Sequence, residues 1–161
     1  MNTSQLIALH ETNRGQIHGL LGGLTDQHLE LCPYPGGHDL RWVLGHLAVS
    51  LDFCGSVLGL APAVPAEWGK QFGPGSSGKT SGGPNLAELV AALDSGHARI
   101  NEAMAKADAA ALAEPHGMDF FNQTPLKTKG DVAALLMTSH AGYHIAQLSA
   151  LRSAVGLKPL F

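Results

Sequence analysis

Apolar residues recur at three- and four-residue spacing in four segments of the chain. This pattern predicts helices over about residues 4–24, 39–60, 85–107 and 131–156. Asp39 and Asn85 precede the apolar positions of the second and third helices as N-cap residues. Asp131 stands at the start of the fourth helix, which Gly156 and Pro159 end. No alternating run of useful length predicts a strand, so we expect an all-α fold.

Gly- and Pro-containing connections join these helices, over residues 25–38, 61–84 and 109–129. The connection over 61–84 is long for a compact domain, which is typical of a loop with a role of its own or of a mobile one. No repeat of fixed period and no linker divides the chain. We therefore expect a single domain over residues 1–161.

Residues 73–80 read GPGSSGKT and match the phosphate-binding pattern G-x-x-x-x-G-K-[ST]. A working P-loop follows a buried strand and leads directly into a helix whose N-terminus faces the phosphates. Here the preceding segment has two prolines and no strand pattern, and Thr80 is followed by Ser-Gly-Gly-Pro, which does not propagate a helix. The string is therefore interpreted as a flexible Gly/Ser loop, and no nucleotide cofactor is expected.

Composition narrows the classes of function. A formal net charge of −3 offers no basic surface for a nucleic acid. No stretch approaches the roughly 20 apolar residues that span a bilayer, and the N-terminal segment lacks the apolar region of a signal peptide. Cys32 and Cys54 form no CxxC pair. A cytoplasmic protein with reduced thiols and no membrane or nucleic-acid partner is expected.

The chain has 9 histidines, which prompts a search for a metal or acid–base site. His10 and Glu11 begin an H-E-x-x-H match, but Arg14 takes the place of the second histidine, so the zinc-protease motif is excluded. The E-x-x-H pair of di-iron bundles is also missing from the sequence.

His140 and His144 lie one turn apart on one face of the fourth helix, and His46 lies in the middle of the second. Mid-helix histidines from two helices can converge in a bundle and provide three metal ligands. On spacing alone, three core histidines hydrogen-bonded to their neighbours fit equally well. His97 is expected as a satisfied core histidine. Surface or loop positions are expected for His10, His18, His28, His38 and His116.

The segments WVLGHLA around His46 and HAGYHIAQLSALRSAVGLKP from His140 to Pro159 resemble the DinB/YfiT-like superfamily of metal-dependent enzymes. That family has a histidine followed by Leu in its second helix and H-x-x-[YH]-H-[IV]-[GA]-Q-[IL] in its fourth. The resemblance implies a four-helix bundle with a long connection between helices 2 and 3, often assembled as a homodimer. It also implies one divalent metal held by three histidines, here His46, His140 and His144.

Relatives in that family include thiol S-transferases that use bacillithiol or mycothiol, and metal-dependent hydrolases or isomerases. A metal-activated water or thiol acting on a small molecule is the catalytic hypothesis, with a low-molecular-weight thiol as one candidate partner. The alternatives are a non-catalytic metal-binding or stress-response protein and a metal-free helical scaffold. Imidazole ligands suit Zn, Ni, Cu or Fe, so the sequence does not identify the metal.

Three further residues are candidates around the metal. Gln147 is either a donor beside the ligands or a core polar group, and Tyr143 either orients substrate or packs in the core. Trp42, one turn before His46, is either core or the floor of the metal pocket. The 61–84 loop is expected near the mouth of that pocket, as a gate.

Overall fold

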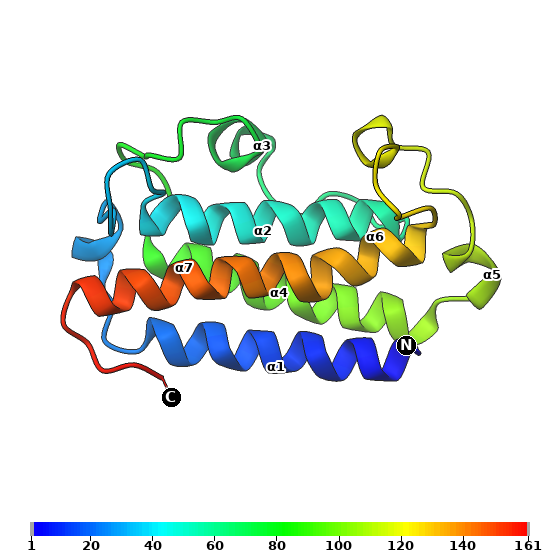
Figure 1. Cartoon of the computed structure of the whole chain (residues 1–161), viewed down its shortest axis with the longest axis horizontal. Coiled ribbons are helices and arrows are strands. Elements are labelled where there is room, and N and C mark those ends of the chain that lie inside the picture. The colour runs from blue at the N-terminus through cyan, green and yellow to red at the C-terminus, as the bar shows by residue number, and fades with distance from the viewer. Residues whose placement is uncertain (1, 161) are drawn as a thin grey trace.

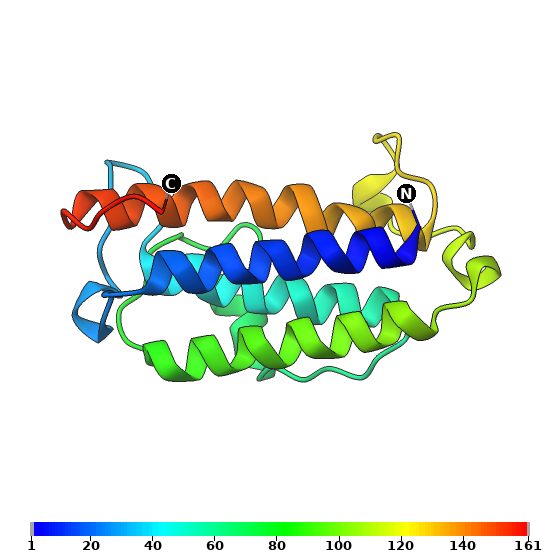
Figure 2. The ribbon, with the colours of Figure 1, turned by 90° about the horizontal axis from the view of Figure 1, so that it is seen from below.

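The long helices of the chain lie side by side as a bundle (Figures 1 and 2). The computed structural model describes residues 2–160, so the ends of the predicted domain, residues 1 and 161, lie outside the described residues. The long elements are α1 (Thr3–Leu21), α2 (Leu40–Val57), α4 (Leu86–Lys106) and a fourth run made of α6 (Lys129–Leu135), η3 (Leu136–His140) and α7 (Ala141–Ala154). Over residues 2–160 there is no strand beyond an isolated Pro115–Thr128 bridge. The all-α prediction is confirmed.

Each long helix packs against two others: α1 against α4 and α7, and α2 against the same two. Helices α2 and α4 run in one direction, and α1 and α7 run in the other (Figure 1). Because α2 and α4 are parallel, the chain returns along the bundle between them, through the long connection that follows α2. The predicted bundle with a long connection between its second and third helices is confirmed. None of the helices within 2–160 combines the length and the apolar character needed to cross a bilayer.

Polar caps explain where the helices begin. The Asp39 carboxylate accepts the backbone N–H of Trp42, 2.7 Å away, and Asn85 forms a reciprocal capping box with Glu88. The fourth run begins earlier than predicted, because Thr128 is its cap and Asp131 is the third helical residue of that capping box. The predicted helix ends are correct to within a few residues.

The connections contain short helices that the sequence pattern did not predict. They are η1 (Asp26–His28), α3 (Ala66–Phe72), α5 (Ala109–Leu112) and η2 (Asp119–Phe121). Helix α3 buries Trp68 and Phe72 and packs on α2. It was missed because it has only 7 residues, too few to establish a helical period.

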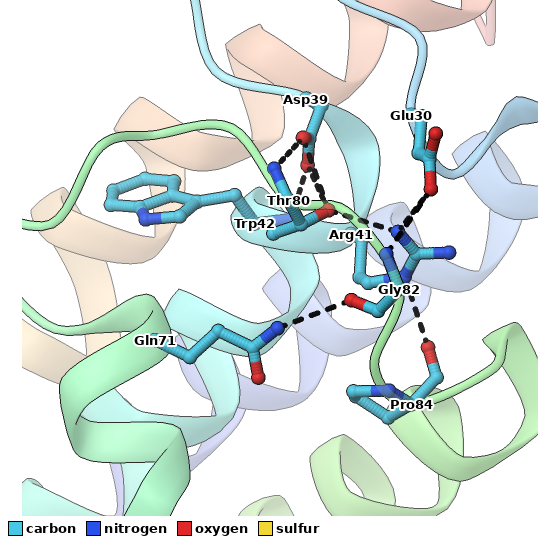
Figure 3. Close-up of polar contacts among 8 residues, drawn as sticks. All are labelled: Glu30, Asp39, Arg41, Trp42, Gln71, Thr80, Gly82 and Pro84. Carbon is cyan, nitrogen blue, oxygen red and sulfur yellow. Dashed lines mark hydrogen bonds and ion pairs between the residues drawn. The ribbon is translucent and has the colours of Figure 1, made fainter.

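Residues 73–80 are tied to the start of α2 and do not form an unattached loop (Figure 3). The Asp39 carboxylate accepts both the backbone N–H and the hydroxyl of Thr80. Arg41, which is buried, donates to the Thr80 hydroxyl at 3.0 Å and to Glu30 at 3.1 Å. The loop prediction holds, but these polar contacts, which the string itself does not reveal, attach the loop to the bundle.

The fourth run is interrupted by the π-helical turn η3 (Leu136–His140), where an unbroken α-helix was predicted. A π-turn changes the hydrogen-bond ladder and leaves backbone carbonyls without their usual partners. The Asn13 side chain of α1 donates to the carbonyls of Met137, at 3.0 Å, and Thr138, at 3.4 Å. Helix α1 therefore stabilises the turn that ends at His140.

Candidate metal centre

Three imidazoles from two helices meet inside the bundle. His46 lies in α2, His140 ends η3, and His144 lies one turn further along in α7. Each offers a nitrogen, and these atoms all lie within 4.8 Å of one another. The Nε2 atoms of His46 and His140 are 3.2 Å apart. Ligands about 2.1 Å from a tetrahedral ion are separated by roughly 3.4 Å. The histidines predicted as a set are thus close enough to hold one metal ion.

The outer nitrogens of two rings are held by specific acceptors. His46 Nδ1–H donates to the carbonyl of Phe72, at the end of α3, over 2.7 Å. His144 Nδ1–H donates to the amide oxygen of Gln147, also over 2.7 Å. Because these acceptors take the Nδ1 protons, each neutral ring keeps its lone pair on Nε2. Such acceptors are the usual partners of metal-ligating histidines.

The three imidazoles are neutral at pH 7. Burial lowers the pKa of His140 to about 4 and that of His144 to about 3, and the neighbouring imidazoles contribute to both shifts. Burial also lowers the pKa of His46. A metal ligand has to be deprotonated before it binds, so these lowered pKa values favour metal binding at neutral pH.

An aromatic stack forms one wall of the centre. Trp42 is buried and stacks on His46 with ring centroids 4.5 Å apart and planes inclined by 7°. Its indole N–H donates to the Ser76 hydroxyl at 2.7 Å. His38 stacks on the other side of Trp42 at 3.8 Å, and its Nδ1 lies 3.4 Å from the Gln147 amide nitrogen. Trp42 is therefore a core residue and a wall of the site at once.

His38 was predicted only as a surface or loop residue. It does lie in the 25–38 connection, but it is half-buried beside the centre. Its position directly before the cap of α2 was a signal for this placement, because Trp42 occupies the first turn of that helix. The 61–84 connection also lies beside the centre through Phe72 and Ser76, as expected; its role as a gate stays a prediction.

Tyr143 is exposed, with 62% of its surface accessible, so the packing role weighed for it is wrong. It directly precedes the inward-facing His144 and therefore lies on the outer side of α7. Its ring meets that of His144 edge-on, at a centroid distance of 5.1 Å. Because the Tyr143 phenol is exposed and its ring contacts His144, the other role considered for it, contact with substrate, stays a prediction.

A second pair of histidines is buried next to the triad. His10 is fully buried, and the surface prediction for it was wrong because Asn101 of α4 accepts its Nδ1–H over 2.8 Å. His97 lies in the core as predicted, stacked on His10 with centroids 4.0 Å apart. Its Nδ1 has no partner among residues 2–160, so the core position is confirmed and the hydrogen bond expected with it stays a prediction. The remaining surface or loop predictions hold for His18, His28 and His116.

Comparisons with known proteins agree with this fold. The family model of the DinB superfamily matches residues 9–148, a span that contains all three histidines. A crystal structure of a conserved protein from Enterococcus faecalis has a TM-score of 0.72 to this fold at 17% identity, over 96% of this chain and 98% of that chain. Among curated proteins, none is significantly similar in sequence. From its helical bundle and the family match over most of its length, this chain belongs to the DinB superfamily.

Proposed function

We propose that this protein binds one divalent transition metal, such as Zn or Ni, through His46, His140 and His144. We further propose that it uses the metal to hydrolyse a small molecule or to transfer a thiol to it. The observation that carries this proposal is the convergence of three neutral imidazoles, two of them with Nε2 free to ligate. Membership in the DinB superfamily supports it.

A divalent ion with three imidazole ligands keeps open coordination positions and lowers the pKa of a bound water or thiol toward neutrality. The protein's own groups divide the remaining work. The Phe72 carbonyl and Gln147 orient two of the rings, and Trp42 excludes water from one side of the centre. We propose that Tyr143 and His38 contact the substrate, a role that the exposure of Tyr143 and the position of His38 beside Trp42 support. We also propose a cytoplasmic homodimer, with a low-molecular-weight thiol as a candidate co-substrate.

Metal analysis tests the binding step. Wild-type protein should take up about one equivalent of Zn²⁺ or Ni²⁺. Removing a residue that only orients a ligand weakens metal binding roughly 10–100-fold. His140→Ala and His144→Ala remove a ligand itself, so each should weaken metal binding by more than that. His18→Ala is the matched control, since His18 is exposed and bonds to Asp94 away from the triad. Unchanged metal content in both triad variants would show that there is no such site.

Turnover tests the catalytic step. Protein loaded with Zn, Ni, Co or Mn should act on members of an ester panel or a thiol-conjugation panel. The same preparations of His144→Ala should be inactive. A wild-type protein that binds metal but turns over neither panel would favour the second candidate, a non-catalytic metal-binding protein with the same ligands.

A further inference from the structure

A small cavity lies beside the triad, in the core of the bundle. Its polar lining consists of His10, Ser50, His97 and His140, and its apolar lining consists of Ile17, Leu47, Leu51, Leu136 and Ala141. The centre of a water-sized sphere can occupy ≈ 10 Å³ of it. That space is about what one water molecule needs, provided that polar partners are present.

Three ring nitrogens of these histidines lack a hydrogen-bond partner within residues 2–160. They are His10 Nε2, His97 Nδ1 and His140 Nδ1, each buried from solvent. Buried polar atoms are almost always paired, because an unpaired one loses its hydration without compensation. Three such atoms on rings that line one cavity point to a shared polar ligand.

The contacts of His10 and His140 determine the hydrogen-bonding character of two of these atoms. Asn101 donates from its amide nitrogen to Glu11, so its oxygen faces His10 and accepts His10 Nδ1–H. His10 Nε2 is therefore an acceptor. His140 directs Nε2 toward His46. When a metal occupies the centre, His140 ligates through Nε2 and carries its proton on Nδ1. In the metal-free protein its Nε2–H donates to His46 Nε2, because the His46 proton is on Nδ1, and His140 Nδ1 is an acceptor. The rings that line the cavity thus offer an acceptor at His10 and, once a metal is bound, a donor at His140, and their shared ligand has to be able to donate and to accept.

A second metal ion does not fit this pattern. Ligands of one ion lie within about 4.2 Å of each other, twice the bond length. Of the described residues, only the His46, His140 and His144 group brings its ligand atoms within 4.8 Å. Partners of a single water can lie up to about 6 Å apart, twice a hydrogen-bond length. A water molecule tolerates a wider spacing than a metal ion and can both donate and accept.

We propose that one buried water molecule binds here, accepting from His140 Nδ1–H and donating to His10 Nε2, with His97 Nδ1 as its third partner. His10 and His97 are then positioning residues for His140. They give His140 what Phe72 and Gln147 give the other two ligands, a fixed outer nitrogen. The presence of the water rests on the unpaired nitrogens alone, because a water can also donate to His140 Nδ1 in the metal-free protein. The donor role of His140 and the positioning role rest on the proposed metal function.

A high-resolution crystal structure of the wild-type protein tests the water site directly. The expected result is an ordered water within about 3.2 Å of the three free nitrogens. A dry cavity, or direct contacts between these rings, would overturn the proposal. This measurement does not depend on metal binding.

Zn²⁺ affinity by chelator competition, and the visible spectrum of the Co²⁺ form, test the positioning role. His10→Leu and His97→Leu should each weaken Zn²⁺ binding about 10–100-fold and shift the Co²⁺ bands. The double variant should be no weaker than the worse single one, because both residues act through the same water. His97→Gln, which keeps a polar atom, should retain nearly wild-type affinity.

Met104→Ala is the matched control for lost packing. Met104 is buried in the same helix, two turns beyond His97, and does not line the cavity. This variant should lose stability but keep the wild-type affinity and spectrum. Wild-type Zn²⁺ affinity in both leucine variants would overturn the positioning role. Failure of the wild-type protein to bind Zn²⁺ would overturn the proposed function instead. In that case, or if a leucine variant did not fold, the crystal structure of the wild-type protein would still decide the water site.

Discussion

Gly45, one residue before His46, marks the point where α2 touches the end of α3. A Cβ placed there would lie 2.5 Å from carbons of the Phe72 ring, which is fully buried. The carbonyl of that same residue accepts His46 Nδ1–H. The lack of a side chain at position 45 therefore allows the contact that orients His46.

We expect Gly45→Ala to destabilise the protein by about 1–3 kcal/mol through overpacking, and to weaken metal binding as Phe72 moves. This cost outweighs the roughly 1 kcal/mol that Ala gains over Gly in a helix. Urea unfolding and chelator competition measure the two effects. Gly15→Ala in α1, where nothing lies within 4 Å, is the matched control and should be at least as stable as wild type. Equal stability of the two variants would contradict the expected clash.

At the same scale, the sequence predicted the triad but not its surroundings. His140 and His144 share a helix face by spacing, His46 was added from its place in the middle of the second helix, and the resemblance favoured metal ligation over a core role for the three. The burial of His10 could not be read from α1, because its acceptor, Asn101, lies 91 positions further along the chain. Among the outer contacts of the ligands, only a role for Gln147 was weighed, and it was weighed as a donor, whereas its amide oxygen accepts from His144.

Among the elements, the π-turn η3 depends on a single side chain of a neighbouring helix. We expect Asn13→Ala to destabilise the protein by about 1–3 kcal/mol, because it removes the side-chain donor to the carbonyls of Met137 and Thr138 in that turn. It should also weaken metal binding, since the turn ends at His140. Thr12→Ala is the control: the exposed Thr12 bonds only within its own helix, so the change should stay within about 0.5 kcal/mol. A wild-type unfolding curve for Asn13→Ala would show that the turn needs no such support.

The sequence did contain a sign of this turn. The inward-facing side of the fourth run follows a strict four-residue spacing through Val132, Leu136, His140, His144 and Leu148. On a helix of 3.6 residues per turn, four such steps drift by about 160°, and one extra residue removes about 100° of that drift. The spacing therefore favours a local π-turn over a regular helix. Short helix α3, in contrast, depends on burial against α2 and left no periodic sign.

On the scale of the whole molecule, the bundle encloses an unusual number of imidazoles. Burial is the largest cause of the lowered pKa values of His10, His97, His140 and His144. Their pKa values in the folded state lie below the value of about 6.5 of an unfolded chain. Below about pH 6.5 the unfolded chain binds more protons than the folded protein. The stability that these neutral rings contribute is therefore fully present above that pH and is lost as the pH falls below it.

We therefore expect the free energy of unfolding of the metal-free protein to decrease from pH 7.5 to pH 5. The slope should approach about 1.4 kcal/mol per pH unit for each buried histidine. Urea unfolding in the presence of a chelator, at several pH values, measures it. His97→Leu should lower the slope, and His18→Ala should leave it nearly unchanged. A stability that does not vary over this range would mean that these rings titrate in the folded protein as they do in the unfolded chain.

The fold as a whole was predictable because the helices are specified locally, by their own apolar stripes and caps at Asp39 and Asn85. The attachment of the 73–80 loop to the bundle was not predictable from the sequence. It depends on Asp39 having a second carboxylate oxygen for Thr80, a contact between residues 41 positions apart.

Because of the π-turn, the proposed metal centre also depends on the number of residues between α6 and α7. Ser139 is exposed, so its deletion removes no core contact, but it takes away the extra residue and rotates α6 against α7 by about 100°. Circular dichroism should show the helix content kept, while stability and metal affinity fall well below those of Ser139→Ala. Unchanged affinity in the deletion variant would mean that the turn can re-form elsewhere. The proposed centre then depends on a count of residues as much as on their identity.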